Sequence, residues 1–294
     1  MKTMTLKGLF LCLVFLLCNA TSHAADDLIT RQITIKLDKA GTLPDKIGSS
    51  KKYKITNLKI VGEINGADFA LIRDMAGLHN DRGKLSVLDL SEAKVVSGGD
   101  TSSYYHTYND YIGGNTFNNC VGLTSLTLPS GVTLIDYSAF EGCIGLTSLD
   151  IPSGVTEIGS SAFEGCSGLT SLDIPSGVTE IGRSAFSGCS GLTSIYVYAG
   201  KLPKMGSDVF NGCDSKKCIV YVPKGEYDDY WLSEFGYFEN IVEFAATGID
   251  KVTTSTDAKE LSRYSVNGQR LSAPAKGLNI VKYSDGSVKK VVVQ

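Results

Sequence analysis

A pattern of hydrophobic and polar positions with a period of 23 residues dominates the middle of the chain. In the unit that contains Leu146-x-x-Leu149-x-Ile151, the apolar residues alternate with polar ones, which predicts a short strand with Leu149 and Ile151 on one face. Pro152 ends that strand, because proline cannot donate to a ladder and the Ser-Gly pair after it favours a turn. One such unit cannot bury its apolar face alone, so the tandem repeat predicts a solenoid of stacked coils.

Phenylalanine and cysteine recur at fixed positions of the repeat and are expected to form ladders inside the solenoid. The positions are Phe140, Phe163 and Phe186 for the rings, and Cys120, Cys143, Cys166 and Cys189 for the thiols. Cysteines on neighbouring coils point in parallel, which suits buried apolar fillers better than disulfides, and ligands in a line cannot surround a metal ion. Cys213 and Cys218 lie outside the 23-residue register, so this argument does not decide whether they form a disulfide.

Before the regular repeats, the same strand pattern occurs at wider spacing. Ile33 to Leu37 predicts a strand in an N-terminal cap region, residues 25–54. The runs that start at Ile55 and Leu85 predict longer coils, with a helix between them that carries Phe69, Ile72 and Met75 at helical spacing. The solenoid is therefore expected over residues 55–225, with about seven coils.

After the solenoid the composition changes three times. Residues 226–246 are aromatic and predict a C-terminal cap, in which Trp231 is expected to seal the core. Residues 247–259 are rich in Thr and Ser and predict a linker. Residues 260–294 predict a small β-rich module of two hairpins with strands Leu261–Val266, Gly277–Tyr283 and Val288–Val293, because Asn-Gly and Asp-Gly turns separate apolar runs.

Two resemblances follow from these motifs. The phrase from Leu146 to Cys166, repeated from Leu169 to Cys189, resembles the BspA-like, Treponema pallidum-type leucine-rich repeats. This resemblance implies a right-handed α/β leucine-rich repeat solenoid with one parallel sheet on the concave face, and a surface or secreted binding role such as adhesion. The blocks Tyr264–Leu271, Gly277–Val281 and Lys289–Val293 resemble the C-terminal sorting domain of the Bacteroidetes type IX secretion system, which implies either an export signal or a retained β-module.

The first residues predict export. Lys2 and Lys7 precede the apolar run Leu9–Leu17, and a small-residue pattern ends at Ala24, so residues 1–24 are interpreted as a secretory signal peptide and the protein is expected at the outer surface or secreted. That run is too short to span a bilayer, so no transmembrane segment is expected. The net charge is −3, and loss of the two lysines makes it −5, which argues against nucleic acid as a partner.

Candidate binding residues lie at two places. The repeat is interrupted between Val96 and Asn119, and aromatic residues crowd into this segment: Tyr104, Tyr105, His106, Tyr108 and Tyr111. Clustered tyrosines suit a binding surface, and they also suit a cover for the first coils, so both interpretations stand. On the strand face, Asp150 and Asp173 occupy equivalent positions, and Tyr196 replaces aspartate one coil later beside Tyr198.

Catalysis finds no support in the sequence. His79 and His106 lie in no known catalytic motif, and the repeat period by itself explains the paired carboxylates. We therefore expect a non-enzymatic binding protein without a cofactor or a metal ion, whose partner is an extracellular protein or a glycan. The alternatives are a structural component of the envelope, which the uniform strand face would suit, and an accessory hydrolase.

Overall fold

The computed structural model describes residues 28–77, 83–99, 107–244, 260–265, 270–271, 273–274, 276–283 and 288–293. The chain forms two compact units, Met1–Glu243 and Phe244–Gln294. The interpretation of residues 1–24 as a signal peptide lies outside the described residues, as do His79 and three candidate site residues: Tyr104, Tyr105 and His106.

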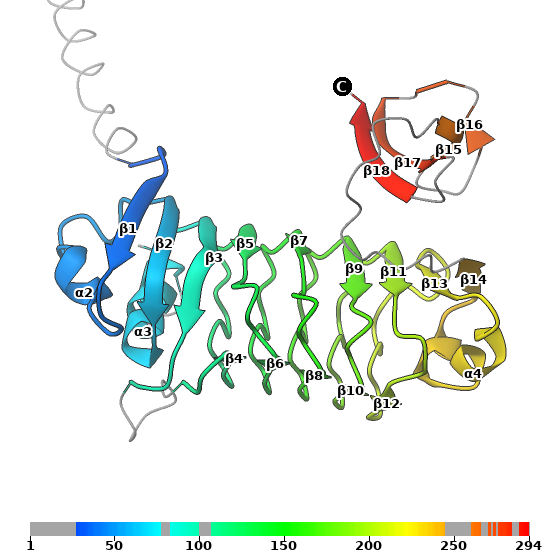
Figure 1. Ribbon diagram of the computed structural model, residues 1–294, viewed down its shortest axis with the longest axis horizontal. Helices are drawn as coiled ribbons and strands as arrows, with labels where there is room; N and C mark the ends of the chain where they lie inside the picture. The colour runs from blue at the N-terminus through cyan, green and yellow to red at the C-terminus, as the bar shows by residue number, and fades with distance from the viewer. Residues whose placement is uncertain are drawn as a thin grey trace, which may run out of the picture. The chain divides into compact units, whose positions relative to one another are not determined.

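The first unit is a repeat solenoid, as the 23-residue period predicts, and one strand of each coil lies in a first row, side by side with its neighbours (Figure 1). Where strands of successive coils pair in this row they are parallel, with Leu126 opposite Leu149 and Leu172 opposite Ile195. The row comprises two hydrogen-bonded sections, β1-β2-β3-β5-β7 and β9-β11-β13-β14. The strands are β1 (Ile33–Leu37), β2 (Asn57–Ile64), β3 (Val87–Val95), β5 (Ser125–Thr127), β7 (Ser148–Leu149), β9 (Ser171–Ile174), β11 (Ser194–Val197), β13 (Ile219–Pro223) and β14 (Asn240–Phe244).

Seven of these strands, β2 to β13 in the row, belong to successive coils, which confirms the predicted number. The structure adds a second parallel sheet that the sequence pattern did not predict, along the other edge of the coils (Figure 1). Its strands have two residues each and follow the order of the coils. They are β4 (Tyr111–Ile112), β6 (Leu134–Ile135), β8 (Glu157–Ile158), β10 (Glu180–Ile181) and β12 (Lys204–Met205).

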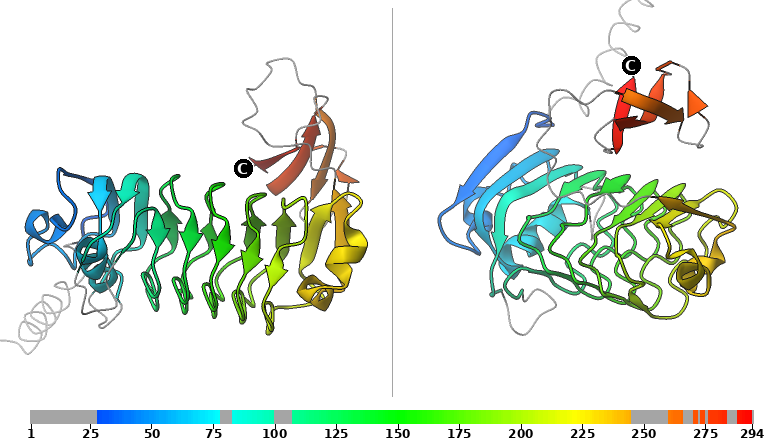
Figure 2. Two further views of the ribbon diagram at one scale, coloured as in Figure 1. Left: turned by 60° about the horizontal axis from the view of Figure 1, so that its bottom comes forward. Right: turned by 45° about the vertical axis from the view of Figure 1, so that its right-hand side comes forward.

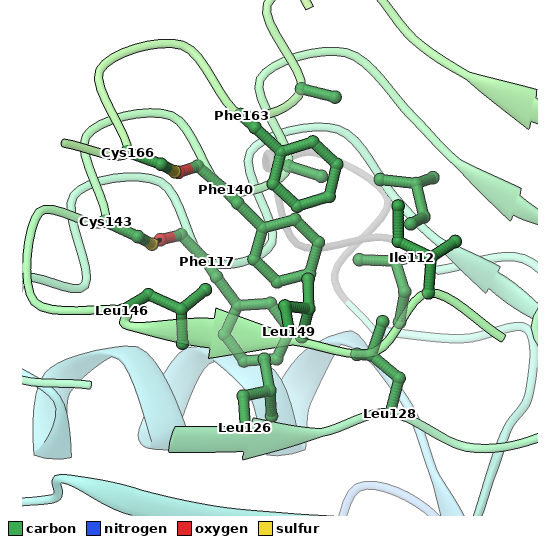
Figure 3. Close-up of a cluster of buried hydrophobic side chains, with 14 of the residues drawn as sticks. Ile112, Phe117, Leu126, Leu128, Phe140, Cys143, Leu146, Leu149, Phe163 and Cys166 are labelled. Carbon is green, nitrogen blue, oxygen red and sulfur yellow. Dashed lines mark hydrogen bonds between the residues drawn. The ribbon is translucent and has the colours of Figure 1, made fainter. Parts of the chain in front are cut away.

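The phenylalanine ladder stands inside the coils. Phe117, Phe140 and Phe163 lie one above another (Figure 3), and the stack continues through Phe186 and Phe210. Neighbouring ring centroids are 4.9–5.8 Å apart with interplanar angles of 8–10°. This spacing follows the distance between adjacent strands, about 4.8 Å, so the ladder exists because the coils stack as a parallel sheet. Every ring of the stack is buried.

The cysteine ladder lies next to the phenylalanines, and its thiols act as hydrogen-bond donors. Cys143 Sγ donates to the carbonyl of Phe117 at 3.0 Å, and Cys166 Sγ donates to that of Phe140 at 3.0 Å. The four ladder cysteines are buried and form no disulfides, and Cys213 and Cys218 are also free cysteines. The thiols therefore satisfy turn carbonyls as well as filling space between coils.

Glycine after the second-sheet strand in several coils, as at Gly159 and Gly182, lets successive coils approach closely. A Cβ added at Gly182 would lie 2.4 Å from the backbone nitrogen of Ser160, and one at Gly159 would lie 2.6 Å from that of Tyr137. These distances are far below van der Waals contact, so only glycine fits the coil spacing at these positions.

Helices close the N-terminal end of the solenoid (Figure 2). They are α2 (Leu43–Lys46) and α3 (Gly66–Met75), and the predicted helix is confirmed, with Phe69, Ile72 and Met75 buried. The buried Asp68 carboxylate accepts hydrogen bonds from three backbone N–H groups, those of Gly41, Leu43 and Asn65. Asp68 thereby ties the segment before α2 to the start of α3.

Aromatic residues close the C-terminal end through α4 (Tyr227–Trp231), the 3₁₀ helix η1 (Glu234–Tyr237) and β14. Phe235 and Phe238 pack on Phe210 with ring centroids 4.9 and 5.1 Å apart. Tyr230 is buried, and its hydroxyl donates to the carbonyl of Ala199 at 3.0 Å. The expectation for Trp231 is wrong: its side chain is 46% exposed, because Tyr230 takes the inward position on the same short helix.

The second unit is an antiparallel sheet with the order β16-β15-β17-β18. Its strands are β15 (Glu260–Ser265), β16 (Arg270–Leu271), β17 (Gly277–Tyr283) and β18 (Val288–Val293). Strand β15 pairs with β16, and β17 pairs with β18, so the two predicted hairpins are confirmed. Val281 and Asn279 are buried in this unit.

Candidate functional site

Side chains on the outer face of the longer strands fall into straight rows, because equivalent residues of successive coils are in register. One row runs through Asp173, Tyr196 and Tyr221, which are direct neighbours on β9, β11 and β13. Asp150 directly follows β7, 23 residues before Asp173 at the equivalent position of the repeat, and is exposed. The row thus changes from carboxylates to phenol rings along the solenoid.

The rings of Tyr196 and Tyr221 stack face to face, with centroids 4.4 Å apart and an interplanar angle of 4°. Tyr198, two residues after Tyr196, lies with its ring nearly parallel at a centroid distance of 6.5 Å. All three side chains are partly buried. The three tyrosines together with Asp173 form a compact group on the strand face, which we call the tyrosine–aspartate cluster.

The environment of this cluster keeps its phenols neutral. Partial burial, with a smaller contribution from the Asp173 carboxylate, raises the pKa of Tyr198 to about 12. Burial also raises the pKa of Tyr196 well above its usual range, and the neighbouring Tyr221 adds to the effect. Burial raises the pKa of Tyr221, although its hydrogen bond with Tyr196 acts in the opposite direction. At neutral pH the cluster therefore presents hydroxyl groups as donors and acceptors beside one carboxylate.

The structure brings together three of the residues predicted for the strand face, Asp173, Tyr196 and Tyr198, and adds Tyr221. A signal for Tyr221 was present in the sequence, since Val220 and Val222 carry the strand pattern and Tyr221 lies between them. The coil before it is longer, because Ile195 pairs with Val220 rather than with a residue 23 positions on. This insertion hides the equivalence of Tyr221 with Tyr196.

The tyrosine-rich segment between Val96 and Asn119, which we call the tyrosine loop, joins the second sheet through β4. Tyr111 belongs to β4 and is 37% exposed, and Tyr108 is 58% exposed with its ring centroid 6.2 Å from that of Tyr111. Tyr137, also exposed, stands next to Gly114, where an added Cβ would meet its ring. Tyr108 and Tyr111 do not join the tyrosine–aspartate cluster, so the predicted residues fall into two separate surfaces.

The paired glutamates of the repeat are also on the second sheet. Glu157 and Glu180 are register neighbours on β8 and β10, and Lys204 on β12 forms an ion pair with Glu180 at 2.8 Å. Within the described ranges, no three His, Cys, Asp or Glu side chains gather as a metal site would require. No helix in the same ranges has the length and apolar character needed to cross a membrane.

In a comparison with protein families, residues 110–225 match the model of the BspA type leucine rich repeat region in six copies. The match covers less than half of the chain, and it spans the coils from β4 to β13. Such repeats stack into extended surfaces that bind other proteins. A comparison with curated proteins finds no match.

Solved structures similar to this chain include leucine-rich repeat proteins. One is the T. pallidum leucine-rich repeat protein TpLRR, with 25% identity over 51% of this chain and 71% of that chain and a TM-score of 0.38. The pneumococcal vaccine antigen PcpA has 15% identity over 67% of this chain and 61% of that chain, with a TM-score of 0.39. A leucine-rich repeat protein from Bacteroides ovatus has 18% identity over 46% of this chain and 58% of that chain, with a TM-score of 0.19.

Proposed function

We propose that this chain is an exported, non-enzymatic binding protein that recognises an extracellular protein or a glycan, as an adhesin does, through its strand face. A solenoid of leucine-rich repeats supplies the extended surface for such a role. The single observation that carries the proposal is the tyrosine–aspartate cluster, which replaces the repeat's uniform polar residues at one place.

The repeat itself provides the comparison that makes this cluster informative. The positions equivalent to Tyr196 in the two preceding coils hold Asp150 and Asp173, and the positions equivalent to Tyr198 hold Pro152 and Pro175. The solenoid therefore does not need aromatic rings there in order to fold. Tyrosines offer broad apolar area with a polar rim, and they are enriched where proteins bind partners.

Export is part of the proposal and has its own support. The lysines, apolar run and small residues of segment 1–24 suit a signal peptide, and the antiparallel hairpins of the second unit suit the sorting domain that its sequence resembles. Two measurements on the protein from its native host would test this claim. N-terminal sequencing tests removal of residues 1–24, and intact mass tests whether the C-terminal unit is retained. A mature protein beginning near residue 25 is expected, and retention of the first residues would contradict the signal peptide.

The binding proposal is tested with residues 25–294 on arrays of extracellular-matrix proteins and glycans. Two variants introduce a residue that other coils carry at the same position: Tyr196→Asp on the strand face, as in Asp173 of the preceding coil, and Tyr111→Glu on the second sheet, as in Glu157 and Glu180 two and three coils further on. Both preserve a residue type that the repeat tolerates, so each is a folding control for the other. We expect Tyr196→Asp to abolish a reproducible array signal and Tyr111→Glu to leave it unchanged.

The opposite result would assign binding to the tyrosine loop, where Tyr108 and Tyr111 are exposed and Tyr104, Tyr105 and His106 lie nearby in sequence. If both variants keep the array signal, neither the strand face nor the tyrosine loop is the binding surface. A chain that binds no array member at all would favour the structural role in the envelope, because a uniform face needs no dedicated ligand.

A further inference from the structure

The short helix α4 lies at the C-terminal end of the solenoid (Figure 1, yellow). It carries an exposed pair of stacked aromatic rings. Tyr227 and Trp231 are 37% and 46% exposed, their centroids lie 6.1 Å apart, and their planes differ by 8°. Tyr230 on the same helix is the ring that packs inward. The solenoid core is therefore closed without Tyr227 and Trp231, which leaves their exposure unexplained by folding.

The surroundings of this pair are strongly acidic. Residues 224–243 contain six Asp and Glu residues against one lysine, whereas residues 201–223 contain four lysines against two aspartates. Two of the six carboxylates are engaged by the backbone, since Glu234 accepts from the N–H of Val209 and Glu243 from that of Gly225. Asp228, Asp229 and Glu239 are exposed at the surface.

Helix geometry distinguishes the two aspartates of α4. Successive residues of a helix are rotated by about 100°, so Tyr227 and Trp231, four apart, lie on one side of it. Asp228 follows Tyr227 directly and precedes Trp231 by three positions, which places it beside the rings. Asp229 is rotated by roughly half a turn from the midpoint of the ring pair and points to the other side.

We propose that the Tyr227–Trp231 pair with Asp228 is a binding site for arginine side chains of a basic protein segment. Faces of tryptophan and tyrosine attract cations, and the planar guanidinium stacks on such rings. A carboxylate at the rim accepts the guanidinium N–H groups in a charge-assisted pair. The acidic excess of residues 224–243 selects a cationic partner over a neutral one. This site uses residues other than those of the tyrosine–aspartate cluster, and the proposal does not depend on that cluster.

Trp231 is the only tryptophan of the chain, so its fluorescence reports on this site alone. The experiment titrates residues 25–294 with the peptide acetyl-Gly-Arg-Gly-Arg-Gly-amide, and with the same peptide in which neutral citrulline replaces both arginines. We expect a saturable change in the emission of Trp231 and protection from acrylamide quenching with the arginine peptide only. Asp228→Asn should lower the affinity by about five-fold or more, whereas Asp229→Asn should change it by less than about two-fold.

The two aspartate variants change the net charge equally on neighbouring residues, so they separate a site from general acidity. Equal weakening by both variants would overturn the proposal, because it would mean that only the overall charge attracts the peptide. An equal response to the citrulline peptide, or a response to neutral oligosaccharides instead, would also overturn it. So would an unchanged emission of Trp231 at saturating arginine peptide. Circular dichroism of each variant confirms that the repeat is folded.

Discussion

Replacing Phe163 with alanine should remove the centre of the phenylalanine ladder. Its ring is buried and stacks on Phe140 at 4.9 Å and on Phe186 at 5.2 Å, with interplanar angles of 8° on both sides. Truncating a buried phenylalanine to alanine costs about 3–5 kcal/mol. Each stacked pair contributes about 0.5–1.5 kcal/mol beyond the buried area, so a large share of that loss comes from the two neighbours.

A second variant isolates the stacking contribution. Phe163→Leu keeps most of the apolar volume and loses both ring pairs, so it should cost about 1–3 kcal/mol. The free energy of unfolding is measured by urea titration of residues 25–294, with far-ultraviolet circular dichroism for the whole chain and Trp231 fluorescence for the C-terminal end. Ser167→Ala, at an exposed turn position, serves as the control and should change stability by less than about 0.5 kcal/mol.

Because coils contact only their neighbours, a gap in the middle of the ladder should also weaken the coupling between the two halves of the solenoid. The two probes should then separate in Phe163→Ala, with different midpoints, although they should coincide in the unmodified chain. A loss below about 1 kcal/mol for Phe163→Ala would refute the reasoning, since it would mean that the stacked rings contribute little to the stability of the repeat.

Three further predictions concern the scaffold. The six described cysteines should resist a thiol reagent in the native state and react together on unfolding. Burial raises the pKa of Cys143 to about 12, so the protonated buried thiol stabilises the fold fully below pH 9, and this contribution is lost as pH rises toward 12. The loss is about 1.4 kcal/mol per pH unit per thiol, which thermal melts between pH 8 and 11 would detect. Gly182→Ala should cost about 1–3 kcal/mol or more in urea titrations, because its Cβ would lie 2.4 Å from the nitrogen of Ser160, whereas Gly200→Ala, with open space around it, is the matched control. Asp68→Ala should cost about 3 kcal/mol and increase hydrogen exchange of residues 41–47, since three backbone N–H groups lose their acceptor; unchanged exchange there would contradict the role of Asp68.

The period of Leu149, Phe163 and Cys166 was sufficient to predict the solenoid, because stacked identical units bury the same positions in every coil. The second sheet was not predictable in this way, since a strand of two residues such as Glu157–Ile158 has no pattern of its own and forms only when coils stack. The exposure of Trp231 was missed because α4 is only five residues long, and hydrophobicity alone does not show which of its rings faces inward.

For the site, the sequence showed where the repeat departs from its own consensus, as at Tyr196 and Tyr198. It did not show which departures meet in space, because Tyr221 is separated from Tyr196 by an insertion and becomes its neighbour only through strand pairing. Tyr108 and Tyr111 were predicted as a candidate surface separate from the strand face, but the sequence did not show that Tyr111 belongs to a second sheet.

The measurement that tests the central claim most directly is hydroxyl-radical labelling of tyrosines in the complex of residues 25–294 with the first array ligand. Tyr196 and Tyr198 lie between Arg183 and Lys201, so a tryptic peptide separates them from Tyr108, Tyr111 and Tyr137. The account predicts that the ligand protects the peptide with Tyr196 and Tyr198, together with the one that contains Tyr221, and leaves Tyr108, Tyr111 and Tyr137 unchanged. Protection of Tyr108, Tyr111 and Tyr137 without any protection of Tyr196, Tyr198 and Tyr221 would contradict it.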